Sequence, residues 1–166
     1  SVDGAITEIV YALKAEDALV GVDTTSLYPP ATRELASVGY KRALSAEGLL
    51  SLRPDLVLAT DDAGPPEVLE QIARAGVAIR QIHDQPTVPG LKEKIRSVAG
   101  TLDRDAAGAA LSADIDAQLE DLAARLKADA PRPRVLFLLH VASGNDLAAG
   151  RDTAIDTVIR LAGGNN

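Results

Sequence analysis

The chain has 166 residues, a mass of 17.3 kDa and a formal net charge of −7 at pH 7. Hydrophobic residues make up 46% and charged residues 25%, a balance typical of folded domains that excludes disorder as the overall state. The acidic charge and the aromatic content of 2% argue against a nucleic-acid-binding role. No apolar run approaches the roughly 18 residues of a membrane span, and cysteine is absent. The chain opens with SVDGAITEIV and contains no methionine, so we expect the natural N-terminus to lie upstream.

Apolar stretches alternate with helix-length patterns along the first hundred residues, which is typical of parallel α/β folds. LVGV (19–22), residues 55–59 within RPDLVLAT, and VAIRQI (77–82) predict strands. Before, between and after them the patterns predict helices over 7–13, 45–52, 65–75 and 88–101. Ser45 is a good N-cap for the helix over 45–52, and Gly76 is suited to end the helix over 65–75. We therefore expect a twisted parallel sheet with helices on both faces.

Residues 104–129 predict one long helix of a different kind. An apolar stripe of leucine and isoleucine recurs every three or four residues, and no proline interrupts it. After PRPR (131–134), VLFLLH (135–140) predicts a strand, GND (144–146) a turn, and 153–161 a helix. One strand and one helix cannot bury their own apolar faces. This second α/β part is thus expected to pack on the first lobe or on a partner chain, or to be a fragment of a larger lobe.

Several segments resemble the haemin-binding periplasmic proteins of bacterial ABC importers. The resemblance rests on TEIVYALKAEDALVGV, on VGYKRALSAEG and on LSLRPDLVLAT followed by a helix and AGV. It implies a Rossmann-like N-terminal lobe over 1–102, an interlobe helix over 103–130 and the start of a second α/β lobe over 131–166. Lys14 departs from the family pattern, which usually has glycine there, and most of the second lobe is absent.

Tyr40 is the leading candidate for a ligand of ferric haem. It lies in GYKR, between a short strand and a capped helix, on the edge where α/β folds bind ligands. A tyrosine phenolate can ligate haem iron, and the resemblance gives Arg42 the role of stabilising it. The alternative is that Tyr40 only anchors the loop and that Arg42 lies in solvent. Tyr28, in SLYPP, is a candidate for bordering the ligand, with an ordinary turn aromatic as the alternative.

The two histidines both follow or end predicted strands. His140 is a candidate second haem ligand, and a hydrogen-bonded histidine at a strand end is the alternative. His83 has no further metal ligands at a suitable spacing, so we interpret it as structural. Asp61 and Asp62 follow a strand, but TDDAGPP lacks the second acidic pair and the lysine of a magnesium or phosphoacceptor site. We expect these two aspartates to be solvated or to lie near a helix N-terminus.

The resemblance implies a periplasmic carrier, not an enzyme, that delivers ferric haem to an inner-membrane ABC permease for iron uptake. It also places on Glu47, in the first turn of a helix, the acidic residue that docks to a basic permease pocket. A ferric-siderophore or cobalamin carrier of the same class is the alternative. An α/β enzyme using Asp61, Asp62 and His83 is the alternative from another class of function.

Overall fold

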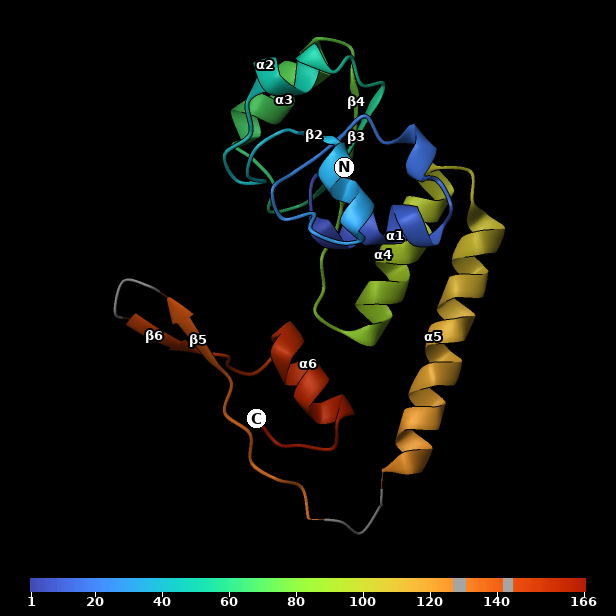
Figure 1. The fold of residues 1–166 in the computed structure, drawn as a ribbon, viewed down its shortest axis with the longest axis vertical. Coiled ribbons are helices and arrows are strands. Elements are labelled where there is room, and N and C mark those ends of the chain that lie inside the picture. The colour runs from blue at the N-terminus through green and yellow to red at the C-terminus, as the bar shows by residue number, and fades with distance from the viewer. Residues whose placement is uncertain (127–130, 142–144) are drawn as a thin grey trace. The chain divides into compact units, whose positions relative to one another are not determined.

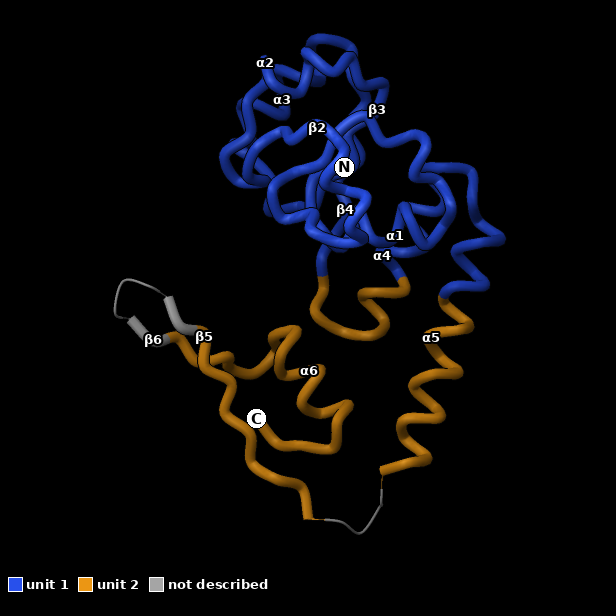
Figure 2. Tube along the Cα trace, in the orientation of Figure 1, with its two compact units in different colours: residues 1–84, 93–111 blue, residues 85–92, 112–166 orange. Residues whose placement is uncertain are grey.

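The computed structural model describes the backbone of residues 1–126, 131–141 and 145–166 (Figure 1). It divides into two compact units (Figure 2). The first comprises Ser1–Asp84 with Glu93–Leu111, and the second comprises Gln85–Lys92 with Ser112–Asn166.

The described strands of the first unit pair in parallel, as the sequence predicts. The first two strands form one pair and the next two form another, with Leu56 opposite Ala78 and Thr60 opposite Ile82 in the second. The alternation of strands with helices favours this parallel arrangement, because a parallel pair needs a crossover connection. The strands are β1 (Gly21–Val22), β2 (Ala36–Ser37), β3 (Leu56–Thr60) and β4 (Ala78–Ile82).

Residues 1 and 2 connect the two strand pairs. Val2 forms a parallel bridge with Ala59, and its N–H donates to the Leu58 carbonyl at 2.8 Å. The nitrogen of Ser1 donates to the Gly21 carbonyl at 2.9 Å. The carboxyl ends of β1 and β3, and the residue after Val2, therefore lie along one edge of the sheet.

The four helices predicted up to residue 101 are observed, although the first begins at residue 4, three residues earlier than predicted. The Ser45 side chain caps the second helix, because its hydroxyl accepts from the Gly48 N–H at 3.3 Å. Gly76 follows the third helix with φ +90°, a conformation that favours glycine. The helices are α1 (Gly4–Ala12), α2 (Ala46–Ser51), α3 (Pro66–Arg74) and α4 (Val88–Thr101), with 3₁₀ turns η1 (Glu16–Ala18) and η2 (Pro30–Glu34).

The core of the first unit lies on both faces of β3. Val57 and Ala59 belong to a buried apolar cluster that includes Leu69 and Ile72 of α3. Leu58 is equally buried, and because side chains alternate along a strand it points to the opposite face. α1 contacts β3, and its buried side chains are Ile6, Thr7, Ile9 and Val10.

The long helix predicted over 104–129 is observed as α5 (Asp105–Arg125). It continues through Gly108 without a break. Gly108 is buried, and a Cβ at this position would lie 2.5 Å from the Ala99 Cβ of α4. The absence of that Cβ allows the two helices to approach closely. Leu126 already follows the helix, and residues 127–129 of the prediction lie outside the described residues.

The second unit contains a strand that the sequence analysis missed. The prediction of a turn at 144–146 is wrong for residues 145 and 146, since β6 (Asn145–Ala148) pairs antiparallel with β5 (Leu138–Val141). Asn and Asp have low β-propensity, and only cross-strand pairing places them in a strand. Residue 144 lies outside the described residues.

Apolar side chains of β5 and β6 remain exposed. Leu138, Leu139 and Leu147 are each more than half exposed, and Ile159 is the one buried hydrophobic side chain among the described residues of the second unit. Ile159 belongs to α6 (Ala154–Leu161), in which the Thr153 hydroxyl accepts from the Asp156 N–H at 3.2 Å. In this unit, helix capping by Thr153 and an ion pair between Asp156 and Arg160 accompany a small apolar core.

Lys14 occupies a left-handed position directly after α1. Its φ is +56°, and the N–H of Lys14 donates to the Tyr11 carbonyl at 3.0 Å while that of Ala15 donates to the Val10 carbonyl at 3.1 Å. These two bonds form a Schellman motif, in which the left-handed residue is usually glycine. The departure of this chain from glycine thus introduces backbone strain.

We expect Lys14→Gly to raise the free energy of unfolding by about 1 kcal/mol, because the left-handed conformation costs an L-residue roughly that much. Urea unfolding monitored by circular dichroism measures the change. Lys14→Ala is the control, since it removes the side chain but keeps the Cβ, and it should give no such gain. Equal stabilisation by both variants would contradict the assignment of strain to the backbone.

Candidate functional site

Polar side chains gather where the parallel strands of the first unit end. Asp3 follows Val2, Asp23 follows β1, and Thr60 ends β3 just before Asp61 and Asp62. In open α/β sheets this edge is where ligands bind. The candidate site is therefore built on loops that the rigid strands hold in place.

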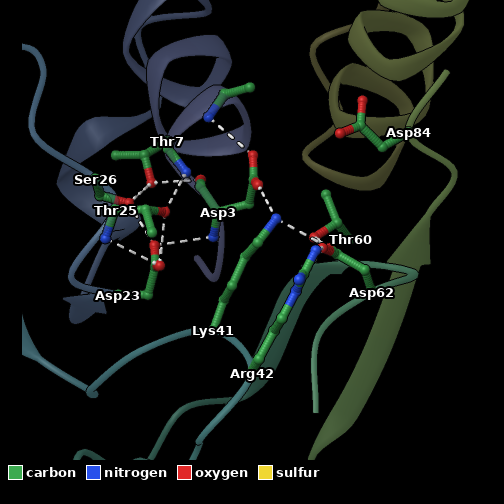
Figure 3. Close-up of polar contacts among 12 residues, drawn as sticks. Asp3, Thr7, Asp23, Thr25, Ser26, Lys41, Arg42, Thr60, Asp62 and Asp84 are labelled. Carbon is green, nitrogen blue, oxygen red and sulfur yellow. Dashed lines mark hydrogen bonds and ion pairs between the residues drawn. The ribbon is translucent and has the colours of Figure 1, made fainter. Parts of the chain in front are cut away.

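Asp23 fixes the loop after β1 (Figure 3). Its side chain is almost fully buried, and its carboxylate accepts from the Asp3 N–H, the Thr25 N–H and the hydroxyls of Thr25 and Ser26, at 2.7–3.1 Å. The Ser26 hydroxyl also shares a hydrogen bond with that of Thr7 in α1. A buried carboxylate with four donors is fully satisfied, so this loop is firmly attached to the start of α1.

Asp3 caps α1 in a strained conformation. Its φ is +125°, and its carboxylate accepts from the Ala5 N–H at 2.9 Å. The other carboxylate oxygen accepts from the Lys41 ammonium at 2.8 Å. Strained residues persist where surrounding contacts determine their conformation, and they concentrate at functional sites.

Lys41 and Arg42 both bind Asp62. The Lys41 ammonium lies 3.0 Å from Asp62 Oδ1, while Arg42 Nε and a terminal guanidinium nitrogen lie 3.0 and 2.6 Å from Oδ2. The Thr60 hydroxyl donates to Asp62 Oδ1 at 2.7 Å. We call these four residues, together with Asp3, the Asp62 cluster (Figure 3). It joins three chain segments that are far apart in the sequence.

The cluster favours the charged forms of its members. Burial alone would raise the pKa of Asp62, but hydrogen bonds from Thr60, Arg42 and Lys41 outweigh it and hold that pKa well below its usual range. Burial would likewise lower the pKa of Lys41, but its bonds to Asp3 and Asp62 raise it. At neutral pH, Asp62, Lys41 and Arg42 are therefore all charged.

Tyr40 and Tyr28 lie on neighbouring loops with much of their surface open. The Thr24 N–H donates to the Gly39 carbonyl at 2.9 Å, so the loops after β1 and β2 are bonded together. Tyr40 is 47% exposed and Tyr28 is 63% exposed. Among the hydrogen bonds of the described residues, none joins Arg42 to the Tyr40 hydroxyl, and the guanidinium instead binds Asp62.

The other predicted residues lie apart from this cluster. His83 follows β4 and binds Asp61 through its Nδ1, while Asp84 binds the buried Lys94. Glu47 is exposed in the first turn of α2. His140 lies in β5, but its side chain is outside the described part.

Asp61 and Asp62 have different partners, so the three residues of the enzyme alternative do not form one cluster. Asp62 binds Lys41 and Arg42, whereas Asp61 binds His83. Within the described residues, no three side chains of His, Asp or Glu are gathered to hold a metal ion.

The sequence analysis missed the role of Lys41 and Asp3. TDDAGPP contains no lysine, but the fold brings Lys41 to Asp62 from 21 residues away. The run GYKRA offered one signal: two adjacent cations in a loop at a sheet edge require acidic partners if they are not solvated. The identity of the acidic partners depends on how three loops meet in the fold, so it cannot be predicted from the spacing of neighbouring residues.

We expect the Asp62 ion pairs to stabilise the fold above about pH 4, the unfolded-state pKa of Asp, and to lose this effect as the pH falls. The folded-state pKa of Asp62 lies below its unfolded value, so the unfolded chain takes up the proton first. At pH 7, Asp62→Asn should lower the free energy of unfolding by about 1 kcal/mol, a modest figure because the side chain is 35% exposed.

Urea unfolding at several pH values measures this difference between wild type and variant, which should shrink below pH 4. Asp61→Asn, which removes the same charge one residue away, is the control and should show a smaller loss at pH 7. A difference for Asp62→Asn that is unchanged down to pH 2 would contradict the role given to ionised Asp62.

The comparisons with known proteins agree on one family. The family model described as "Periplasmic binding protein" matches residues 1–166. The solved periplasmic heme-binding protein BhuT, in complex with two hemes, is 46% identical with a TM-score of 0.89, covering 99% of this chain and 65% of that one. The apo form of RhuT from Roseiflexus sp. RS-1, another periplasmic heme-binding protein, is 43% identical with a TM-score of 0.90, covering 99% and 64%.

A curated relative binds a different ligand. The vitamin B12-binding protein of Pectobacterium carotovorum is 32% identical over 93 residues, which cover 56% of this chain and 33% of the relative. The chain spans about half the length of the curated relatives it matches. Across the described helices, none has both the length and the hydrophobicity needed to cross a membrane. With a family match along its whole length, and with the α/β fold of that family, the chain belongs to the periplasmic binding proteins, a family of extracytoplasmic location.

Proposed function

We propose that the chain is part of a haem carrier that delivers ferric haem to an ABC permease for iron uptake. The observation that carries this proposal is an exposed tyrosine, Tyr40, on a ligand-binding edge and directly before two ordered cations. The haem-binding proteins BhuT and RhuT support it, because they resemble this chain over 99% of its length.

Tyr40 supplies the axial ligand in this proposal. A phenolate binds ferric iron well, but a free tyrosine has a pKa of about 10 and is protonated at neutral pH. The bound iron provides most of the stabilisation that the phenolate needs. Arg42, two residues along, provides the rest when its guanidinium donates to the phenolate oxygen.

Other residues have supporting roles. Tyr28, on the loop bonded to that of Tyr40, borders the haem. His140 is at most a secondary ligand from the opposite side of the haem. The protein binds and releases its ligand without changing it, and Asp61 and His83 keep a structural role, consistent with their bond to each other.

A cobalamin carrier is the second candidate, favoured by the relative that binds vitamin B12. Cobalamin brings its own axial ligands, so it does not require a tyrosine at position 40. Ferric siderophores, whose iron is enclosed by the chelator, do not require one either. The dependence of binding on the Tyr40 hydroxyl therefore separates haem from both.

We expect the full-length protein to bind haemin and to show a phenolate-to-iron charge-transfer band in its absorption spectrum. Tyr40→Phe, which removes only the hydroxyl, should abolish the band and cause the largest loss of affinity. Arg42→Ala should weaken binding by about one to two decades, the value of a charge-assisted hydrogen bond shielded from solvent. His140→Ala should have a mild effect.

Tyr11→Phe is the matched control, because Tyr11 lies within α1 and should leave the band unchanged. A Tyr40→Phe variant with the band and with wild-type affinity would show that Tyr40 is not the ligand. Tyr28→Phe would then identify the other candidate. Tight binding of cobalamin without any binding of haemin would reject the proposed ligand class.

We expect Glu47→Ala to leave haemin affinity intact but to lower haem transport in cells or in vesicles that contain the permease. Glu47 is exposed in the first turn of α2, where it is free to pair with a basic pocket. Asp105→Ala is the control, since Asp105 is also an exposed acid in the first turn of a helix. Both variants lose a favourable interaction with the helix dipole, but only Glu47→Ala should reduce transport. Equal transport by the two variants would leave Glu47 with the helix-terminus role alone.

A further inference from the structure

We infer that Asp62 is a positioning residue for the ligand loop, residues 39–44. By holding Lys41 and Arg42, it sets the loop that carries Tyr40 before any ligand arrives. The inference rests on the proposed function, in which Tyr40 ligates the haem iron.

The backbone of the ligand loop is bonded to the segment that carries Asp62. The Gly64 N–H donates to the Lys41 carbonyl at 2.9 Å, and the Leu44 N–H donates to the Gly64 carbonyl at 3.0 Å. Within the loop, the Ala43 N–H donates to the Tyr40 carbonyl at 2.8 Å. Two bonds thus hold the loop against the chain that follows β3, and a third closes a turn within the loop.

The side chains strengthen this attachment at the two residues next to Tyr40. Lys41 is only 14% exposed and lies between Asp3 and Asp62, so it connects the loop both to α1 and to β3. Arg42 is 61% exposed, and Asp62 is its one ion-pair partner among the described residues. Loss of Asp62 would leave Lys41 with Asp3 but would release Arg42.

A single carboxylate can serve both cations because its position is itself fixed. The Thr60 hydroxyl at the end of β3 donates to Asp62 Oδ1. Lys41 and Thr60 use one oxygen, and Arg42 uses the other (Figure 3). Asp62 therefore connects the ligand loop to the end of strand β3.

This arrangement matters for binding because ordering a loop costs conformational entropy. A loop that is ordered before the ligand arrives avoids that cost during binding, and the affinity is higher as a result. Arg42 then has only to move from Asp62 to the phenolate oxygen. Its path is short because Tyr40 is two residues away.

The test compares Asp62→Asn with Asp61→Asn in the full-length protein. The two variants remove the same charge from adjacent residues, but Asp61 binds His83 and contacts neither cation. In the ligand-free protein, hydrogen exchange at the Ala43, Leu44 and Gly64 amides should be at least about fivefold faster in Asp62→Asn. It should be unchanged in Asp61→Asn. Local opening of this kind is what amide exchange reports.

Haemin titration provides the second readout. Asp62→Asn should weaken haemin binding roughly tenfold, within the range measured for coupled neighbours, and should alter the position or intensity of the charge-transfer band at saturation. Loss of global stability alone would not alter the band of the folded complex. In an Arg42→Gln background the same substitution should cost less, because one of the contacts it removes is already missing.

Each outcome has a distinct meaning. Wild-type exchange rates at the three amides in Asp62→Asn would overturn the inference, whatever the ligand proves to be. Faster exchange with wild-type affinity and an unchanged band would also overturn it. If the wild-type protein binds no haemin, the proposed function fails, and the exchange rates alone then decide whether Asp62 orders the loop.

Discussion

The ion pair between Lys41 and two carboxylates connects parts of the candidate site that come from three separate segments. Asp3 belongs to the start of α1, Lys41 to the loop after β2 and Asp62 to the loop after β3. Because Lys41 is largely buried, its charge requires these partners. The conformation of the loop that carries Tyr40 therefore depends on contacts that only the folded sheet creates.

The sheet edge provides the frame for this interaction. Parallel strands place all their carboxyl ends on one side, so the loops after β1, β2 and β3 meet at that edge. Asp23 binds the first of these loops to Asp3 through buried hydrogen bonds. The strain at Asp3, with its positive φ, is held by the same contacts. A ligand that binds at this edge meets loops that are already ordered.

Proteins of different ligand specificity match this chain. Haem-binding and vitamin B12-binding relatives both match the chain, so the frame alone does not define the ligand. In the proposed function, specificity comes from side chains that project from the loops, such as Tyr40 and Tyr28. The fold therefore identifies the family, whereas the identity of the ligand depends on particular side chains.

The sequence alone determined the local elements of the first unit and the chemistry available to it. Helix caps such as Ser45, the glycine after α3 and the alternation of strands with helices are encoded by neighbouring residues, so they could be predicted. The resemblance also identified the family and Tyr40 as a candidate, although the role of Tyr40 stays a prediction. Local patterns failed at β6, where low-propensity residues enter a strand because β5 lies beside them.

Only the tertiary structure decided the partners of the charged residues. Asp61 and Asp62 are adjacent and chemically identical, but one binds His83 and the other binds Lys41 and Arg42. Lys14 is a different case, because the resemblance had already marked it as a departure from glycine and its strain arises locally, in the Schellman motif after α1. Ion pairs between segments depend on how loops cross at a sheet edge. A sequence pattern records which charges exist, and the fold decides which of them meet.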